Sequence, residues 1–164
     1  MEAPHCKRHG HNDSAVTSPF TLRPYQPSDE DTAIALWQRT WQLAYPQIDF
    51  AARVAWWRER WRNELVPNAA IIIAEHAANL VGFVTIDGAG YLDQLVVAPE
   101  HWGSKLADAL VDEAKLRSPE GVSLLVNKDN TRAIRFYERN GFHHAGDDVN
   151  PTSGRPVLRM AWTP

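Results

Sequence analysis

A strand–loop–helix segment in the middle of the chain carries residues that suit phosphate binding. It reads Leu95-Val-Val-Ala-Pro-Glu-His-Trp-Gly-Ser-Lys-Leu-Ala-Asp-Ala-Leu110, an apolar strand followed by a short loop and a helix. The first turn of a helix leaves backbone N–H groups without intrahelical partners, and these groups attract anions. We therefore expect a phosphate or diphosphate at the start of this helix. The segment has neither the G-x-G-x-x-G fingerprint of a dinucleotide-binding loop nor the residue order of a Walker loop.

A second segment, Asn127-Lys-Asp-Asn-Thr-Arg-Ala-Ile-Arg-Phe-Tyr-Glu-Arg-Asn-Gly-Phe142, makes the chemistry more specific. Together the two segments resemble the paired motifs of the GNAT superfamily of N-acetyltransferases. That family's motifs read roughly L-x-V-x-P-x-x-(Q/R)-G-x-G-(I/L)-(G/A)-x-x-L and N-x-x-A-x-x-(F/L)-Y-x-x-x-G-F. The chain matches the first at Leu95, Val97, Pro99, Gly103, Leu106, Ala107 and Leu110, and the second at Asn130, Ala133, Phe136, Tyr137, Gly141 and Phe142.

The resemblance implies acetyl-CoA as co-substrate and a place for it. In this family two neighbouring parallel strands splay apart and hold the pantetheine arm, and here they would be residues 91–97 and 122–126. Asn130 would hydrogen-bond the arm, with a helix cap as the alternative role. The implied backbone contacts are Leu95, Val96 and Val97 for the arm, and Gly103, Ser104, Lys105, Leu106 and Ala107 for the diphosphate. The helix-terminus argument places the phosphate at the same loop independently.

Tyr137 matches the position of the family's frequent general acid. Acyl transfer needs a proton for the departing thiolate of CoA, and a phenol with an ordinary pKa near 10 stays protonated at neutral pH until it is needed. Because Phe136 and Tyr137 lie on an amphipathic helix, core packing is the alternative role.

The general base is less clearly marked. Tyr91 stands where family members often carry a glutamate. Asp93, two residues further, shares the same strand face and is our candidate base, with a structural or surface carboxylate as the alternative. Histidine as a residue type has an ordinary pKa in a suitable range, but His101 lies at the phosphate end of the loop.

Two residues depart from the first motif. Trp102 takes the place of the usual Gln or Arg, and Lys105 takes the place of the central glycine. Glycine there lets the backbone approach a phosphate closely. The Lys105 side chain must therefore point away, pair with a phosphate through its ammonium group, or obstruct the ligand. This departure motivates an alternative function, a non-catalytic GNAT-fold module that binds an acyl-CoA or another ligand.

The elements that must position these residues follow from apolar periodicity. Strand patterns lie at 21–24, 70–75, 80–87, 91–97, 122–126, 142–145 and 156–162, and helical patterns at 28–45, 51–65, 104–117 and 130–140. The order β-α-α-β-β-β-α-β-α-β-β excludes a doubly wound fold, because three strands run in succession without crossovers. We predict one α+β domain, residues 21–164, with a central mixed, mostly antiparallel sheet flanked by helices. Residues 1–20 are predicted to be a flexible tail.

Five of the seven Trp residues fall between Trp37 and Trp61. Their helical spacing predicts packing of a helix pair on the sheet. An aromatic wall for a substrate pocket is the alternative, and Trp56, which lies off the apolar stripe, is the best candidate for it. We expect the acceptor to enter between these helices and the loop 146–155.

Composition bounds the partners. The 164 residues carry a formal net charge of -3, which does not suit nucleic-acid binding. The longest apolar run, 69–74, is far below the roughly 20 residues that cross a membrane. The N-terminus lacks the apolar core of a secretory signal, and Cys6 is the one cysteine, so we expect a cytoplasmic protein. Cys6, His9 and His11 do not complete a four-ligand zinc set, so no metal is expected.

The sequence therefore predicts an acetyl-CoA-dependent N-acetyltransferase. The acetyl group would pass to a primary amine of a small-molecule or peptide acceptor, by direct attack on the thioester. No covalent intermediate is expected, because Cys6 lies in the predicted tail. The final strand offers an edge for a homodimer.

Overall fold

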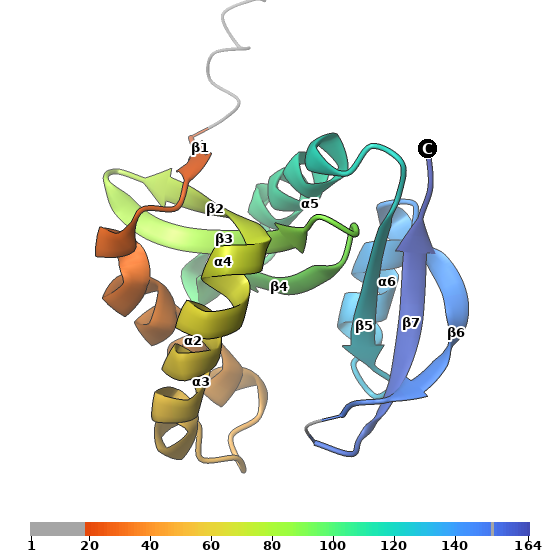
Figure 1. The fold of residues 1–164 in the computed structure, drawn as a ribbon, viewed down its shortest axis with the longest axis horizontal. Coiled ribbons are helices and arrows are strands. Elements are labelled where there is room, and N and C mark those ends of the chain that lie inside the picture. Colours follow the sequence, from red (N-terminus) through yellow and green to blue (C-terminus); the bar gives the residue numbers. More distant parts are fainter. Residues whose placement is uncertain (1–18, 152) are drawn as a thin grey trace, which may run out of the picture.

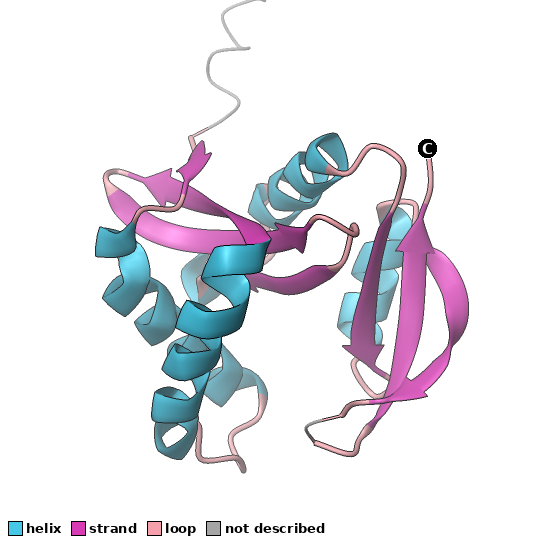
Figure 2. Cartoon of the chain, viewed as in Figure 1, coloured by secondary structure: helices cyan, strands magenta, loops and turns pink. Residues whose placement is uncertain are grey.

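The computed structural model describes residues 19–151 and 153–164, which form two antiparallel sheets with helices packed on them (Figures 1 and 2). The first sheet has the order β1-β2-β3-β4 and the second the order β5-β7-β6. The strands are β1 (Thr21–Pro24), β2 (Ala69–His76), β3 (Asn79–Asp87), β4 (Leu92–Val97), β5 (Val122–Asn127), β6 (His143–Val149) and β7 (Pro156–Trp162). The final strand, β7, is therefore paired on both sides, and the expectation that it offers an edge for a homodimer is wrong. The predicted α+β class, with antiparallel strands flanked by helices, is confirmed. The predicted mixed sheet is present as two antiparallel sheets, linked by a parallel bridge between Tyr91 and Ser123.

The helices follow the expected order, with one composite segment. The main helices are α2 (Glu30–Ala44), α3 (Val54–Arg60), α5 (Leu106–Arg117) and α6 (Thr131–Arg139), with short turns η2 (Pro27–Asp29), η3 (Ala51–Arg53) and η5 (Pro99–His101). The predicted helix 51–65 is η3, α3 and a wider π-helical turn, η4 (Trp61–Leu65), which continues into α4 (Val66–Asn68). Pro67 in α4 donates no backbone hydrogen bond, and the helical segment ends one residue later. Among the described residues, no helix combines the length and apolarity needed to span a membrane.

The tryptophans of α2, α3 and η4 form the core between these helices and the first sheet. The indoles of Trp37 and Trp57 stack with centroids 4.6 Å apart, and Trp61 packs edge-on against Phe83 at 5.3 Å. All three indoles are buried, so the packing interpretation holds for them. Trp56 is 47% exposed, in keeping with its position off the stripe.

Helix α5 lies close against β3 because of a glycine. A Cβ atom on Gly82 would stand 2.8 Å from the Val96 carbonyl oxygen and 3.3 Å from the Leu110 side chain. Leu106 and Leu110 are fully buried in this contact. The first turn of α5 is therefore fixed at the end of β4, where the phosphate is expected.

The last hairpin differs from the prediction. Strand β6 extends to Val149, whereas the sequence pattern suggested a strand over 142–145 and a connecting loop from 146. A register shift between His144 and Gly146 interrupts the β6–β7 ladder, and all seven β6 residues are exposed. Because no face of β6 is buried, its sequence lacks the apolar alternation that would have revealed its length.

Candidate functional site

The site is built where β4 and β5 part. The two strands begin together, since the Ser123 amide donates to the Gly90 carbonyl at 2.9 Å and Tyr91 bridges Ser123. Beyond that point β4 is the edge of one sheet and β5 is the edge of the other (Figure 1). Gly90 has a φ of +85°, and a Cβ atom there would stand 2.6 Å from the Gly121 carbonyl oxygen. Only glycine permits this close start, from which the strands diverge as the resemblance implies.

The register of β4 decides which backbone groups face this opening. Val96 lies opposite Phe83, and the Ala98 amide donates to the Val81 carbonyl at 2.8 Å. In an antiparallel pair, alternate residues bond to the partner strand and the residues between them turn outward. The peptide groups of Leu95 and Val97 therefore face the opening, while those of Val96 bond to β3.

A β-bulge lies in the middle of β4. The three residue steps of β4 from Leu92 to Leu95 lie opposite only two residue steps of β3, from Ile86 to Val84. The Gln94 amide, displaced by the extra residue, donates to the buried Thr85 hydroxyl at 3.0 Å. Bulges change the direction of neighbouring side chains, and this one lies beside Asp93.

Asp93 is held in an ion pair with Arg60. The Arg60 guanidinium donates to both carboxylate oxygens, with an Nη1–Oδ1 distance of 3.1 Å, and Gln94 Nε2 donates to Oδ1 at 2.9 Å. Burial lowers the pKa of Arg60, but the hydrogen bond and charge of Asp93 outweigh it, so the Arg60 pKa lies above its ordinary value. Arg60 also lies 5.4 Å over the Trp57 ring. Sequence analysis missed Arg60, and its position off the apolar stripe of α3 was the available signal.

The loop before α5 and the first turn of the helix offer free amides. The Ser104 amide and hydroxyl both donate to the His101 carbonyl, at 3.2 and 2.6 Å, and the Leu106 amide donates to the Ser104 hydroxyl at 3.2 Å. Within the described part of the chain, the amides of Gly103, Lys105 and Ala107 have no hydrogen-bond partner. These three amides are available to an anion.

Lys105 does not need the conformation of a glycine. Its φ is −87°, in the ordinary range for any residue, and its side chain is exposed. Gly103 has the positive φ, +85°, with open space around its Cβ position. Gly103, and not Lys105, is therefore the position in this loop whose positive φ favours glycine.

Helix α6 places Asn130 and Tyr137 on the β5 side of the opening. Asn130 Oδ1 accepts the Ala133 amide at 3.1 Å, so Asn130 caps the helix. Tyr137 is 9% exposed, and its ring contacts Phe136 and Phe142 with centroids 5.2 and 5.5 Å away. Among the described residues its hydroxyl has no hydrogen-bond partner, and burial raises the pKa of Tyr137 above its ordinary value. Ring packing therefore fixes the position of the phenol, while in the described structure its hydroxyl group donates no hydrogen bond.

The expected acceptor side brings three elements together. Asn127 at the end of β5 donates to the Tyr45 hydroxyl at 3.0 Å, and the Arg155 guanidinium lies 5.5 Å over the Tyr45 ring. A cavity of about 220 Å³ opens beside them, lined by Ala44, Tyr45, Asp129 and Asn130.

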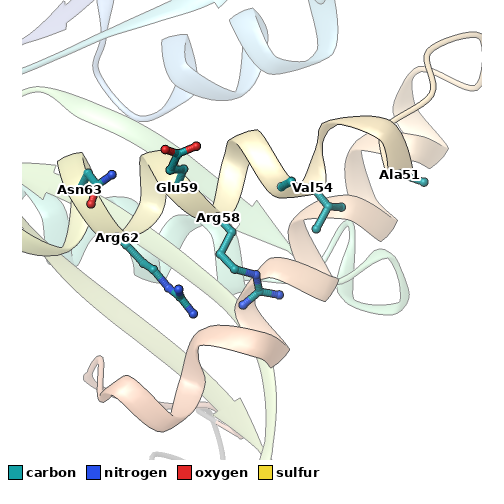
Figure 3. A pocket seen from close by; sticks show the side chains of 7 residues that line it. Ala51, Val54, Arg58, Glu59, Arg62 and Asn63 are labelled. Atoms are coloured by element: carbon teal, nitrogen blue, oxygen red, sulfur yellow. The ribbon is translucent and has the colours of Figure 1, made fainter.

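A larger groove lies on α3, apart from this site. Its volume is about 640 Å³, and Figure 3 shows Arg58 and Arg62 pointing from it toward α2. Both arginines pair with Glu30, at 2.8 and 2.6 Å, which fixes α3 on α2. None of the predicted site residues lines this groove. The described residues contain no cluster of three His, Cys, Asp or Glu side chains suited to a metal, and Cys6, His9 and His11 lie outside them.

The fold and its parted strands are those that the resemblance implies. The model of the acetyltransferase (GNAT) family matches residues 31–142, and the chain belongs to this family. The prediction of an acetyltransferase enzyme is confirmed, and the comparisons lend no support to a non-catalytic module.

Two similar curated proteins are peptidyl-lysine N-acetyltransferases. YjaB of Salmonella typhimurium is 26% identical over 138 residues, covering 84% of this chain and 92% of that protein. YiaC of Escherichia coli is 27% identical over 144 residues, covering 86% and 95%. Among solved structures, the PaiA N-acetyltransferase of Thermoplasma acidophilum in complex with coenzyme A is similar, with a TM-score of 0.70, 22% identity and coverage of 90% and 100%.

Proposed function

We propose that this enzyme transfers the acetyl group of acetyl-CoA to the ε-amine of lysine in a peptide or protein. The observation that carries the proposal is the opening between β4 and β5, with outward peptide groups along it and three free amides at its end. The peptidyl-lysine acceptor of the two relatives, which this chain covers at 92% and 95% of their lengths, favours a peptide over the small acceptor.

The backbone would hold acetyl-CoA along β4. The peptide groups of Leu95 and Val97 would bond the pantetheine arm, and the amides of Gly103, Lys105 and Ala107 would bond the diphosphate. Val96, Ser104 and Leu106 would shape the slot, because their backbone groups are already bonded. The side-chain amide of Asn130 would donate to the arm, since its oxygen caps the helix.

Tyr137 would serve as the general acid. The lysine nitrogen attacks the thioester carbonyl carbon, an N–C bond forms, and the C–S bond breaks with its electron pair leaving on sulfur. Tyr137 gives its proton to that sulfur. Its raised pKa keeps the phenol protonated through neutral and mildly alkaline pH.

Asp93 would receive the proton that the amine loses, through a bridging water, with Arg60 as its positioning residue. The ion pair holds the carboxylate in place beside the bulge. The same pairing occupies both oxygens of the Asp93 carboxylate, so Asp93 would reach the amine only through the bridging water. We therefore expect Asp93 to contribute less to the rate than Tyr137.

The test is CoA release with acetyl-CoA and a set of lysine peptides, with mass spectrometry of the product. The matched control is the same peptide with arginine in place of lysine. Acetylation of the lysine peptide alone supports the proposal. Release with small amines and with no peptide would remove the peptide acceptor, and no release with any amine would contradict the transferase itself.

A further inference from the structure

Trp102 lies over the end of the slot at the point where the acyl-CoA arm would meet the diphosphate. Its indole Nε1 donates to the Val97 carbonyl oxygen at 2.8 Å. Val97 is one of the two β4 residues whose peptide groups face the opening. Trp102 is 43% exposed, so a ligand can reach it.

Arg132 reaches the same indole from the other side of the slot. Its guanidinium carbon lies 5.7 Å from the centre of the Trp102 ring, within the range of a cation–π contact. Trp102 follows β4 and Arg132 lies in the first turn of α6, which follows β5. The contact therefore spans two strands that belong to different sheets. Within the described residues, Arg132 is exposed and has no ion-pair partner.

We propose that Trp102 and Arg132 form a gate across the slot that an acyl-CoA must part in order to bind. An amide N–H of the pantetheine arm would replace the Trp102 N–H on the Val97 carbonyl. The guanidinium of Arg132, released from the indole, would face the diphosphate. This proposal rests on the proposed function, because it assumes that the β4–β5 slot is the acyl-CoA site.

Opening the gate breaks the Trp102–Val97 hydrogen bond and frees Arg132 to face the diphosphate, and these two changes set the expected effects on acetyl-CoA binding. The unbound protein satisfies the Val97 carbonyl with its own indole, so ligand binding must first break that bond. A neutral hydrogen bond changes an equilibrium by about fivefold. Trp102→Phe removes the competing N–H but keeps an aromatic ring for Arg132, so it should tighten acetyl-CoA binding by about fivefold.

The experiment is calorimetric titration of the full chain with acetyl-CoA, together with intrinsic tryptophan fluorescence. The variants are Trp102→Phe and, as a matched control, Trp162→Phe, whose indole lies on β7 against Lys115. The gate predicts tighter binding by Trp102→Phe alone. It also predicts a ligand-induced emission change that Trp102→Phe lacks and that Trp162→Phe retains. Arg132→Gln should weaken acetyl-CoA binding while leaving acetyl-pantetheine, which has no diphosphate, unaffected.

The possible outcomes distinguish failure of the gate from failure of the proposed acetyl-CoA site. Binding by Trp102→Phe where the native protein binds poorly would support both. Native binding that Trp102→Phe leaves unchanged or weakens would overturn the gate and leave the transferase standing. No binding by the native protein or by any variant would overturn the acyl-CoA site, and the gate with it.

Discussion

The candidate catalytic side chains on the two sides of the slot differ in their hydrogen bonding. On the β4 side Asp93 is bonded to Arg60 and Gln94, and the Ser104 and Leu106 amides have partners within the loop. On the α6 side the Tyr137 ring is packed, but in the described structure its hydroxyl is unbonded. On the β4 side the Asp93 side chain is therefore fixed before substrate arrives, and the groups left free there are backbone amides. The α6 side presents the group that is free to give up a proton.

The largest expected effect comes from removing that free group. Tyr137→Phe should lower kcat by about 10²–10⁴, the usual contribution of a general acid. Stability should change little, because the ring contacts remain and the hydroxyl has no bond to lose in the described structure. Steady-state CoA release and thermal unfolding measure the two effects. An activity within threefold of the native enzyme would show that the proton comes from elsewhere.

The next effect tests the fixed side. Asp93→Asn should lower kcat by about 10- to 100-fold, less than Tyr137→Phe because Asp93 is bonded to Arg60 and Gln94 and would reach the amine only through a water. It should also cost about 1–3 kcal/mol of stability, since Arg60 loses Asp93 and keeps only the more exposed Glu64 as a charged partner. The double variant Arg60→Met with Asp93→Asn should recover stability but not activity. If the double variant recovers activity as well, Asp93 has a structural role only.

Lys105 provides a smaller test at the phosphate end. Because Lys105 has an ordinary φ and an exposed side chain, it should favour the diphosphate through its ammonium group. Lys105→Gly should weaken acetyl-CoA binding by about two- to fivefold, the range of an exposed ion pair. Calorimetry measures this change, and tighter binding by the glycine variant would show that the lysine obstructs the site.

The smallest effect concerns the start of α2. A hydrogen bond from Arg23 holds the pKa of Asp29 below its ordinary value. Such a carboxylate contributes stability above its unfolded pKa, near 4, and loses it as pH falls through the lowered folded value. Native protein should therefore lose stability below about pH 4 more steeply than Asp29→Asn. Denaturant unfolding from pH 3 to 7 measures this, and parallel curves would contradict it.

Most helices and strands could be predicted from the sequence, because neighbouring residues determine where each one begins and ends. Apolar periodicity and Pro99 placed β4, and the glycine and asparagine at 140–141 placed the end of α6. The Arg60–Asp93 pair was not predictable. Apolar periodicity shows which face of α3 is buried, but it does not show which strand lies next to the residues beside that face. The bond from Trp102 to Val97 also depends on the bulge and on the path of the loop. Both features arise from tertiary packing, which one sequence does not encode locally.

The most direct test of the slot is amide mapping by ¹H–¹⁵N NMR during titration with acetyl-CoA. We expect the largest shifts at Leu95, Val97, Gly103, Lys105 and Ala107, with smaller shifts at Asn130 and Tyr137. Ser104 and Leu106 should retain their internal bonds. Shifts confined to the groove on α3, residues 51–63, or no shifts at all, would contradict the claim that acetyl-CoA binds between β4 and β5.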